Sequence, residues 1–442
     1  MIYSHQNNFF NNFEEVERLL LFNSANQIKP GLERIKSLLK NLNNPQNSFP
    51  SMHIVGTNGK GSTAAFIESV FRTSGYKTGF YSSPHLENPG ERLLINSKEL
   101  NSKDWLRAVK ITVNALDNKN CNINNESFDK TSYFELLTAS AFLLAEENNI
   151  DIGIIEAGLG GRLDATNLLE RVKCSVITSI SMDHMEYLGD TLEKIASEKF
   201  DVIRKNTPAV FSGNEKSLVN LFRKFCNEKN SYGYVLNEDA EIKNIEISLN
   251  GNTFDFYSEN LNLKNVHTNL IGSFQVKNAA LALLAISKIK NSFPKINNES
   301  ILSGIKNTFW KGRLEIISKN PWVIIDGGHN PDGVRNLVES IKTLFHNKKI
   351  GIVYAVMKDK DYISCLKILN ELHPSLYTTC VPEMKRSLSP QELLNSAENF
   401  KWENKISCFE NPLDAVEKSK LENDLTIICG SLYLIGMLRS KL

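Results

Sequence analysis

A short glycine-rich segment carries the residue types needed to hold a phosphate group. Residues 56–62 follow the apolar run 52–55 and precede the helical pattern of residues 63–70, so we expect them at a strand-to-helix turn. Glycines let backbone N–H groups approach phosphate oxygens, and the following helix directs the positive end of its dipole at them. A lysine adds charge, and a serine hydroxyl could lie near a bound magnesium ion. The residues expected to hold the phosphates are Gly56, Thr57, Asn58, Gly59, Lys60, Gly61 and Ser62.

The spacing of this segment differs from the usual phosphate loop. The usual pattern has four residues between its glycines and places Ser or Thr directly after Lys. Here two residues separate Gly56 from Gly59, and Gly61 stands between Lys60 and Ser62. An ordinary glycine-bearing turn is therefore an alternative for the segment taken alone, and residues further along the chain decide between the two interpretations.

Polar side chains also follow other predicted strands, where open α/β sheets bind their ligands. Ser83 follows a strand ending at Tyr81, Glu156 closes a second strand, and Asp183 and His184 come after a third. Magnesium bound to a nucleotide keeps few protein ligands and takes the others from phosphate and water. Imidazole is an unusual magnesium ligand, so a hydrogen-bonded loop histidine is the alternative for His184 alone. Convergence of these groups with a phosphate loop in one crevice favours a role at metal or phosphate.

The elements that position these residues alternate in type along the chain. Short β-branched runs alternate with amphipathic segments, which is the pattern of parallel strands joined by crossover helices. We expect strands over residues 52–55, 78–81, 152–156, 175–180 and 209–212. Helical periodicity is clearest over residues 133–147 and 275–289. Residues 230–269 alternate around Asn250, Gly251 and Asn252, so we expect a small antiparallel excursion there.

A second α/β series follows residue 312. Its strands are expected over residues 323–326, 350–356, 376–381 and 425–430. With 442 residues the chain exceeds the size at which one core keeps growing, so two domains are expected. We predict an α/β fold in which residues 1–308 form an ATP-binding P-loop domain and residues 309–442 a Rossmann-like domain.

Composition excludes several classes of partner. Hydrophobic content of 41% and charged content of 23% are those of a globular protein, and a net charge of +1 gives no electrostatic reason to expect nucleic acid or membrane. No apolar run approaches the roughly 20 residues that span a bilayer. The first seven residues lack the features of a secretory signal. Seven cysteines without paired metal-ligand spacing indicate buried thiols, so we expect a cytoplasmic protein.

Motifs in a fixed order along almost the whole chain carry a family resemblance. The segments are residues 31–35, 56–62, 83–86, 160–167, 183–184, 198–199, 312–315, 326–331 and 430–433. In this order they resemble the folylpolyglutamate synthases and dihydrofolate synthases of the Mur ligase superfamily. The resemblance implies a P-loop-containing, Mur-ligase-like central domain with a mostly parallel sheet, followed by a Rossmann-like domain that closes over the nucleotide and binds glutamate.

The resemblance also assigns roles in the first domain. The Lys60 loop would hold the phosphates of ATP, and Ser83, Glu156 and His184 would bind Mg²⁺. Lys199 would be the lysine that becomes carbamylated. Carbamylation converts the ammonium group into a carboxylate, and it requires the neutral amine and hence a lowered pKa. The alternative for a helical lysine is a solvated charge with its stem packed against the fold.

Further roles fall on residues closer to the carboxyl terminus. Arg313 would reach the phosphates, Asp326 and His329 would complete the nucleotide site, and Asn278 would lie beside the adenine. On local sequence alone, the favoured interpretation of His329 is a residue that stabilises the turn of Asp326, Gly327 and Gly328. The chain departs from the family at Lys311, where a proline commonly precedes the Gly-Arg pair, so the hinge before Arg313 is expected to be less rigid. It also departs after Lys199, where Phe and Asp replace Ala and Gly.

The pterin site is indicated by two short segments. Ser132, Phe134, Asp164 and Ala165 resemble the residues that hold dihydropteroate in family members able to make dihydrofolate, although Thr is expected at Ser132. A phenylalanine at the start of an amphipathic helix is also a common core residue. We favour a bifunctional enzyme, and an enzyme restricted to polyglutamate extension is the alternative.

The activity implied is an ATP-dependent amide ligation through an acyl phosphate. It would join L-glutamate to dihydropteroate or to the tail of a reduced folate, in a monomer that binds small molecules. A nucleotide-driven P-loop ATPase switch is an alternative from another class. A ligase for a cell-wall nucleotide precursor is a further one, although only about 50 residues precede the phosphate loop, too few for a typical extra domain.

Overall fold

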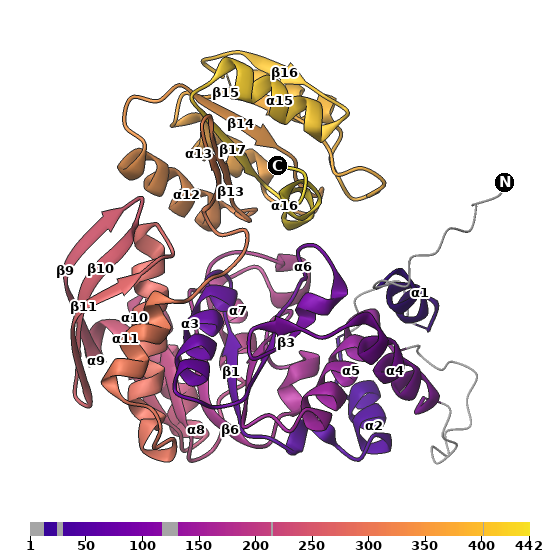
Figure 1. The fold of residues 1–442 in the computed structure, drawn as a ribbon, viewed down its shortest axis with the longest axis vertical. Helices are drawn as coiled ribbons and strands as arrows, with labels where there is room; N and C mark the ends of the chain where they lie inside the picture. Colours follow the sequence, from indigo (N-terminus) through magenta and orange to yellow (C-terminus); the bar gives the residue numbers. More distant parts are fainter. Residues whose placement is uncertain (1–12, 24–29, 117–130, 214, 401) are drawn as a thin grey trace.

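The computed structural model describes residues 13–23, 30–116, 131–213, 215–400 and 402–442. Figure 1 shows a larger lobe built from the first part of the chain and a smaller lobe, in orange and yellow, built from the last part. The first seven residues, on which the argument against a secretory signal depends, lie outside the described residues.

The larger lobe is organised around an eight-stranded sheet in the order β4-β3-β2-β5-β1-β6-β7-β8. Its strands are β1 Ser51–Val55, β2 Thr78–Tyr81, β3 Leu93–Ile95, β4 Lys98–Glu99, β5 Ile152–Glu156, β6 Val172–Ile177, β7 Pro208–Phe211 and β8 Tyr232–Val235. The six strands β2, β5, β1, β6, β7 and β8 pair in parallel, in this order. Strands β3 and β4 add an antiparallel edge. Every residue of β1 and β5 is buried, as expected for strands covered on both faces.

Helices cover both faces of this sheet. They are α1 Phe13–Asn23, α2 Glu33–Asn41, α3 Lys60–Thr73, α4 Ser102–Asn114, α5 Tyr133–Glu147, α6 Met185–Leu188, α7 Leu192–Phe200, α8 Lys216–Glu228, α9 Leu236–Asp239, α10 Ser273–Ile289 and α11 Asn298–Lys306. One apolar core joins α3, α10 and α11 to the central strands, and a second joins α2, α4 and α5 to the sheet. The expected helices at residues 133–147 and 275–289 correspond to α5 and α10.

The antiparallel excursion is a three-stranded sheet in the order β11-β10-β9. Its strands are β9 Ala240–Ser248, β10 Gly251–Ser258 and β11 Leu261–Thr268, and Figure 1 shows them beside α10 and α11. The predicted hairpin turn joins β9 to β10. The excursion is shorter than expected, because Tyr232–Val235 pairs with β7 as the last strand of the main sheet.

The smaller lobe contains a six-stranded sheet in the order β12-β13-β17-β14-β15-β16. Its strands are β12 Glu315–Lys319, β13 Trp322–Ile325, β14 Ile350–Tyr354, β15 Ser375–Thr378, β16 Ile406–Cys408 and β17 Leu425–Cys429. Its helices are α12 Pro331–Leu344, α13 Tyr362–Asn370, α14 Pro390–Glu398, α15 Pro412–Glu422 and α16 Leu432–Arg439. The five strands β13, β17, β14, β15 and β16 pair in parallel, in this order, and β12 pairs antiparallel with β13. The predicted Rossmann-like α/β character of this lobe is therefore confirmed.

Two expectations from the sequence need correction. The strand expected over residues 175–180 is β6, which begins at Val172 and ends at Ile177, so a short loop precedes Asp183. The cysteines are not uniformly buried, since Cys408 is exposed. Within the part of the chain that the structure describes, none of the helices combines the length and apolar content that crossing a bilayer would require.

Candidate nucleotide and substrate site

The phosphate loop turns from β1 into α3 as the sequence predicts. Gly59 has φ +84°, a left-handed conformation that glycine adopts without strain, and it is the residue before the first turn of α3. A Cβ atom on Gly59 would lie 2.5 Å from Oδ1 of Asn278, so the absence of a side chain lets α10 approach the loop. The first N–H groups of α3 have no partner within the helix and are available to an anion.

Two lysines donate to one carbonyl oxygen of this loop. The Nζ atom of Lys60 lies 3.2 Å from the Gly56 oxygen and 3.1 Å from the Thr57 oxygen. The Nζ atom of Lys199, on α7, lies 2.8 Å from the same Gly56 oxygen. Lys199 therefore belongs to the phosphate loop's surroundings although 143 residues separate it from Gly56.

Lys199 is buried, contrary to the usual behaviour of a helical lysine. Its exposed fraction is 3%, and burial together with the nearby charge of Lys60 lowers its pKa from 10.5 to about 7. At neutral pH a large share of the Lys199 side chains is therefore the neutral amine. This is the condition that carbamylation requires.

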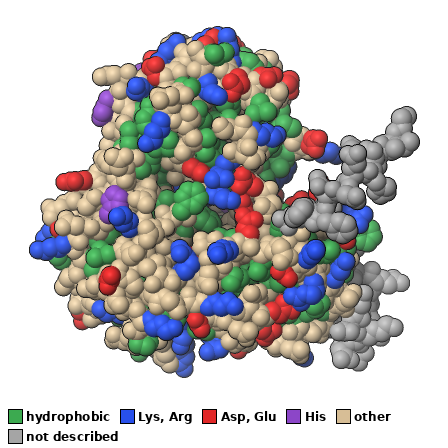
Figure 2. All heavy atoms as spheres, viewed as in Figure 1, with side chains coloured by type: hydrophobic (Ala, Val, Ile, Leu, Met, Phe, Trp, Pro, Cys, Tyr) green, Lys and Arg blue, Asp and Glu red, His purple; other side chains and the backbone are tan. Residues whose placement is uncertain are grey.

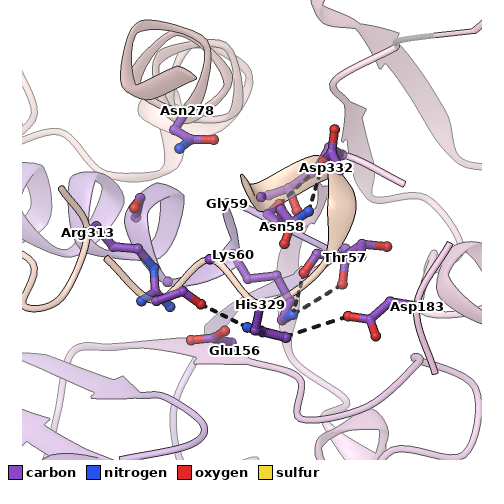
Figure 3. A pocket seen from close by; sticks show the side chains of 18 of the residues that line it. Thr57, Asn58, Gly59, Lys60, Glu156, Asp183, Asn278, Arg313, His329 and Asp332 are labelled. Carbon is purple, nitrogen blue, oxygen red and sulfur yellow. Dashed lines mark hydrogen bonds and ion pairs between the residues drawn. The ribbon is translucent and has the colours of Figure 1, made fainter. Parts of the chain in front are cut away.

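Glu156 places a buried carboxylate at the carboxyl end of β5. It is 5% exposed, and burial raises its pKa although Lys60 and Arg313 oppose the shift and a backbone hydrogen bond from Ser83 also lowers it. Figure 3 shows Glu156, Lys60, Arg313 and His329 around one space. A buried carboxylate with positive groups on several sides suits a bound cation and its phosphate ligands.

Asp183 connects the two lobes. Its Oδ1 atom lies 2.8 Å from Nζ of Lys360, and its Oδ2 atom accepts a hydrogen bond from Asn330 at 3.0 Å. Burial alone would raise the pKa of Asp183, but His329 together with the charges of His184 and Lys360 outweighs burial and holds the pKa well below its usual range. Asp183 is thus an anion that binds two elements of the smaller lobe.

His184 has a competing partner in the structure. Its Nε2 atom lies 3.3 Å from Nζ of Lys360, and burial lowers its pKa to about 4. The neutral ring accepts a hydrogen bond from the ammonium group at this distance. For His184 to bind a metal through Nε2, Lys360 would have to move away.

The linker between the lobes carries Arg313 into the site. The carboxylate of Asp326, directly after β13, accepts hydrogen bonds from the N–H groups of Leu314 at 2.8 Å and Gly328 at 2.7 Å. A Cβ atom on Gly327 would lie 2.4 Å from Nη1 of Arg313, so only glycine leaves room for the guanidinium group. Asp326 therefore acts on the nucleotide site through the backbone of the linker. Burial raises the pKa of this carboxyl, and Arg313 opposes the shift.

His329 stabilises a turn and also faces the candidate site. Its Nδ1 atom donates to the Gly327 oxygen at 2.8 Å, which stabilises the turn, and its Nε2 atom lies 3.8 Å from Oδ2 of Asp183. The neighbouring Asn330 exchanges hydrogen bonds of 3.1 Å with Asn58, so the phosphate loop contacts the smaller lobe directly.

Asn278 faces the phosphate loop from α10. Its Nδ2 atom donates to Gln275 at 3.0 Å, and Gln275 donates to the Ser62 hydroxyl at 3.3 Å. Figure 3 shows Asn278 on a helix that borders the pocket. The polar face of α10 is therefore tied to the carboxyl end of the loop through Ser62.

These groups line one cavity of about 300 Å³. The structure brings together in it every residue predicted for nucleotide, metal or carbamylation: Gly56, Thr57, Asn58, Gly59, Lys60, Gly61, Ser62, Ser83, Glu156, His184, Lys199, Asn278, Arg313, Asp326 and His329.

A second cavity of about 580 Å³ adjoins the first. The residues predicted to hold the pterin all line it: Ser132, Phe134, Asp164 and Ala165. Ser132 caps α5 through a reciprocal pair of hydrogen bonds with Glu135. The Phe134 ring packs against the apolar core and also borders the cavity, so its role in substrate binding stays a prediction.

Sequence reasoning missed several residues of the site. Lys360 and Arg386 line the second cavity, and Asp332 accepts a hydrogen bond from Asn58 at 2.8 Å. A signal existed for Lys360, because it lies in a charged run that begins soon after a predicted strand, β14. No comparable signal marks Arg386.

Comparisons with known proteins agree over nearly the full chain. Residues 54–286 match the model of the Mur ligase middle domain, and residues 312–432 match that of the Mur ligase, glutamate ligase domain. A dihydrofolate synthase/folylpolyglutamate synthase of Bacillus subtilis is 35% identical over 425 residues, which cover 94% of this chain and 95% of that protein.

Solved structures give the same result. A folylpolyglutamate synthase of Thermotoga maritima is 32% identical with a TM-score of 0.84, and the match covers 97% of this chain and 96% of that one. The Escherichia coli FolC protein in complex with DHPP and ADP is 27% identical with a TM-score of 0.86, over 96% and 97% of the two chains.

Proposed function

The chain belongs to the Mur ligase family, and from that premise we propose that it is an ATP-dependent ligase that joins L-glutamate to dihydropteroate and to the glutamyl tail of reduced folates. The relatives named as both dihydrofolate synthase and folylpolyglutamate synthase support the bifunctional assignment. The protein is therefore an enzyme that forms carbon–nitrogen bonds.

The observation that carries this proposal is the common wall of the two cavities. Ser83, Pro84, Gly158, Leu159, His184, Leu188, His329 and Leu432 line both of them. A triphosphate held by the loop in one cavity and a carboxylate held in the other would meet at this wall. A P-loop switch that only changes its binding partner would not need such a second cavity.

In the first cavity we assign ATP to residues 56–62, with Asn278, Arg313, Asp326 and His329 completing the site. The support is their common cavity and the free N–H groups at the start of α3. ADP bound to the Escherichia coli relative supports the ligand class. Lys60 would leave the loop carbonyls and bind phosphate oxygens instead.

We further propose Mg²⁺ as the metal, held by Ser83, Glu156 and His184. No group of three or more His, Cys, Asp or Glu side chains that could hold a metal ion occurs within the described ranges, so the ion would depend on phosphate and water for most of its ligands. The buried Glu156 carboxylate fits such an ion, because an ionised group at this depth requires a cation nearby. When bound, Mg²⁺ supplies charge stabilisation at the phosphoryl group.

The chemistry follows from the poor leaving group of a carboxylate. Transfer of the terminal phosphoryl group from ATP converts the pterin-linked carboxylate into an acyl phosphate. The amine of glutamate attacks the acyl carbon, a tetrahedral intermediate forms, and phosphate leaves with formation of the amide. Arg313 and Lys60 would stabilise the negative charge of the transferring group. The contact between the lobes would keep water, the competing nucleophile, away from the acyl phosphate.

In the second cavity we assign the pterin to the region of Ser132, Phe134, Asp164 and Ala165. The incoming glutamate would bind on the side of the smaller lobe, where Lys360 and Arg386 offer positive charge to its carboxylates. DHPP bound to the Escherichia coli relative supports a pterin-type ligand.

We also propose that the domains divide between residues 308 and 309, since every strand of the third sheet lies beyond this point. The six cysteines among the described residues are free thiols, which supports the proposal of a cytoplasmic protein. We propose that it acts as a monomer on small molecules.

The direct test offers purified protein ATP, Mg²⁺ and isotopically labelled L-glutamate with dihydropteroate or with tetrahydrofolate. We expect each acceptor to gain glutamate by mass, with one ADP formed for each amide. ATP hydrolysis that proceeds equally without pterin and glutamate would contradict the ligase assignment and favour the switch.

The Lys60→Ala variant tests the phosphate loop within this assay. Loss of one charge that stabilises the transferring group should lower kcat by about 100-fold or more. Lys60 is the partly exposed first residue of α3, so we expect the free energy of unfolding of the variant to change by less than about 0.5 kcal/mol. The exposed Lys405→Ala variant, far along the chain, is the control, and wild-type rates for Lys60→Ala would remove the loop from the mechanism.

A further inference from the structure

A buried histidine stands outside the mechanism derived above. His53 lies in the middle of β1, the strand that leads into the phosphate loop, and its exposed fraction is 0%. Burying an imidazole costs free energy unless hydrogen bonds compensate, so such a residue in a central strand calls for an explanation. Apolar side chains precede and follow it in the strand.

His53 begins a chain of short hydrogen bonds. Its Nε2 atom lies 2.8 Å from the hydroxyl oxygen of Thr166, in the short helix Ala165–Leu168. The same hydroxyl lies 2.6 Å from Oδ1 of Asp164. A distance of 2.6 Å is typical of a hydroxyl that donates to an ionised carboxylate. Burial raises the pKa of Asp164, and the hydrogen bonds from Leu159 and Thr166, which favour the ionised form, oppose this shift.

The proton positions along this chain follow from counting donors. A threonine hydroxyl has one proton, which the Thr166 hydroxyl donates in a hydrogen bond to the Asp164 carboxylate. The hydroxyl must then accept from His53, so Nε2 carries the ring proton and Nδ1 carries none. Nδ1 indeed has no hydrogen-bond partner among the residues described. Burial, with a smaller effect from Arg204, lowers the pKa of His53 to about 3, so the ring stays neutral.

Asp164 in turn fixes the loop that precedes it. Its Oδ1 atom also accepts the N–H of Thr166 at 2.9 Å, and its Oδ2 atom accepts the N–H of Leu159 at 2.8 Å. One carboxylate thus joins both ends of residues 159–166. With these bonds made, Asp164 is 4% exposed and has little capacity left for further donors.

This loop borders both ligands of the proposed reaction. Leu159 lies in the wall common to the two cavities, and Asp164 and Ala165 line the second cavity only. A change in the rotamer of Asp164 would therefore displace the wall of the second cavity, assigned to the pterin, more than the wall of the first cavity, assigned to the nucleotide.

We propose that His53 and Thr166 are positioning residues for the pterin: His53 holds the Thr166 hydroxyl, Thr166 orients the Asp164 carboxylate, and Asp164 holds residues 159–166 in the shape that binds the substrate. The inference rests on the proposed function, because it concerns the same cavity. Neither His53 nor Thr166 contacts the reacting atoms, and both act through Asp164.

Thr166 offers a matched pair of variants. Thr166→Val keeps the size of the side chain and removes the hydroxyl, whereas Thr166→Ser keeps the hydroxyl. Loss of a hydrogen bond to an ionised group predicts a KM for dihydropteroate at least ~10-fold higher in Thr166→Val, with the KM for ATP changed by less than about threefold. Thr166→Ser should stay within about threefold of wild type for both substrates. Equal effects of the two variants would indicate packing only and would overturn the proposal, as would an unchanged KM in Thr166→Val.

His53 offers a second pair. The amide nitrogen of Gln reaches the position of imidazole Nε2, so His53→Gln should keep the donor, whereas His53→Leu removes it. We expect the KM for dihydropteroate to rise in His53→Leu and to remain near the wild-type value in His53→Gln. A higher KM for dihydropteroate in His53→Gln than in His53→Leu would overturn the proposed hydrogen-bond chain from His53 to Asp164. Thermal unfolding of both variants identifies any loss of fold.

A spectroscopic measurement separates this inference from the proposed function. In protein labelled with ¹⁵N histidine, the His53 ring should show a protonated Nε2 and a bare Nδ1, without change from pH 5 to 8. A protonated Nδ1 would overturn the proposed hydrogen-bond chain, whether or not the protein ligates glutamate. Absence of glutamate ligation by the wild-type protein would instead refute the proposed function, and the NMR result would still decide the hydrogen-bond chain.

Discussion

The Gly56 carbonyl is the residue-scale feature on which the candidate site depends. Lys60 and Lys199 both donate to it, so two ammonium groups lie close together beneath the phosphate loop. Their mutual repulsion adds to burial in disfavouring a charge on Lys199, whose pKa falls to about 7. Sequence reasoning named Lys199 but could not place its pKa, because the residues that bury it come from distant parts of the chain.

The lowered pKa predicts how Lys199 reacts with carbon dioxide. Only the neutral amine forms a carbamate, and with a pKa of about 7 its fraction rises roughly tenfold between pH 6 and pH 8. At a fixed concentration of dissolved ¹³CO₂, we expect the rate of carbamate formation to rise with pH over this range, as followed by ¹³C NMR.

The control for this prediction is Lys199→Arg, whose guanidinium group stays charged and forms no carbamate. We expect both the carbamate signal and the glutamate ligation to be lost in this variant. A rate that does not vary between pH 6 and pH 8, or a label that persists in Lys199→Arg, would contradict the assignment.

At the scale of elements, the linker and the loop after β2 are held together by charge. Lys311 lies 3.0 Å from Glu87 and 3.0 Å from Glu91, and Glu87 also lies 3.1 Å from Arg439 on α16. Arg439 continues the network to Glu315 at 2.8 Å. Figure 2 shows acidic and basic side chains side by side where the two lobes meet. The network fixes the linker in the way that a proline would fix a hinge.

The Lys311→Met variant tests this network. Removal of the Lys311 ammonium group leaves Glu87 and Glu91 without one partner. We therefore expect the free energy of unfolding to fall by about 1 kcal/mol at low salt. The loss should shrink in 1 M NaCl, which screens the pairs, as measured by urea unfolding. Since Arg313 follows two residues later, we also expect the KM for ATP to rise.

Two further variants show whether the lost charge causes the loss of stability in Lys311→Met. Lys311→Arg keeps the charge and should retain wild-type stability, and Lys405→Met removes an exposed pair with Glu422 and should cost less than about 0.5 kcal/mol. A salt-independent loss in Lys311→Met would indicate packing of the lysine stem as the cause.

Elements differed in how well the sequence predicted them. Buried parallel strands such as β5 have continuous apolar runs, and their bounds follow from the sequence. Strand β3 and the edge strands β4, β12 and β16 were missed, because they are short or mixed in polarity and their pairing depends on neighbours rather than on pattern. The end of β6 was placed three residues too late, since the β-branched residues Thr178 and Ile180 continue the strand-like composition into the following loop.

At the scale of the whole molecule, a polar network joins the lobes across the active site. Asn58 of the phosphate loop bonds to Asn330 and Asp332, and Asp183 bonds to Lys360. The sequence predicted that the lobes meet, since ligand motifs occur in both. It could not predict which side chains meet, because no local pattern links positions more than 140 residues apart.

The Lys360→Met variant tests this contact between the lobes. Without Lys360 the buried Asp183 carboxylate loses its ammonium partner, so the arrangement in which the lobes touch becomes less favourable. We expect a larger radius of gyration by small-angle scattering in the nucleotide-free protein. Lys342→Met, which removes an exposed pair within the smaller lobe, is the control. Identical scattering curves for the two variants would contradict the prediction.

The double use of the Gly56 carbonyl also orders the assembly of the active enzyme. On the proposed assignment, an arriving triphosphate would draw Lys60 toward it, and the anionic phosphates would then favour the protonated form of the neighbouring lysine. Carbon dioxide would therefore have its best access to a neutral Lys199 before the nucleotide is in place. Maturation of the catalytic centre would precede the first turnover, and enzyme stored with nucleotide but without carbon dioxide should start its first cycles slowly.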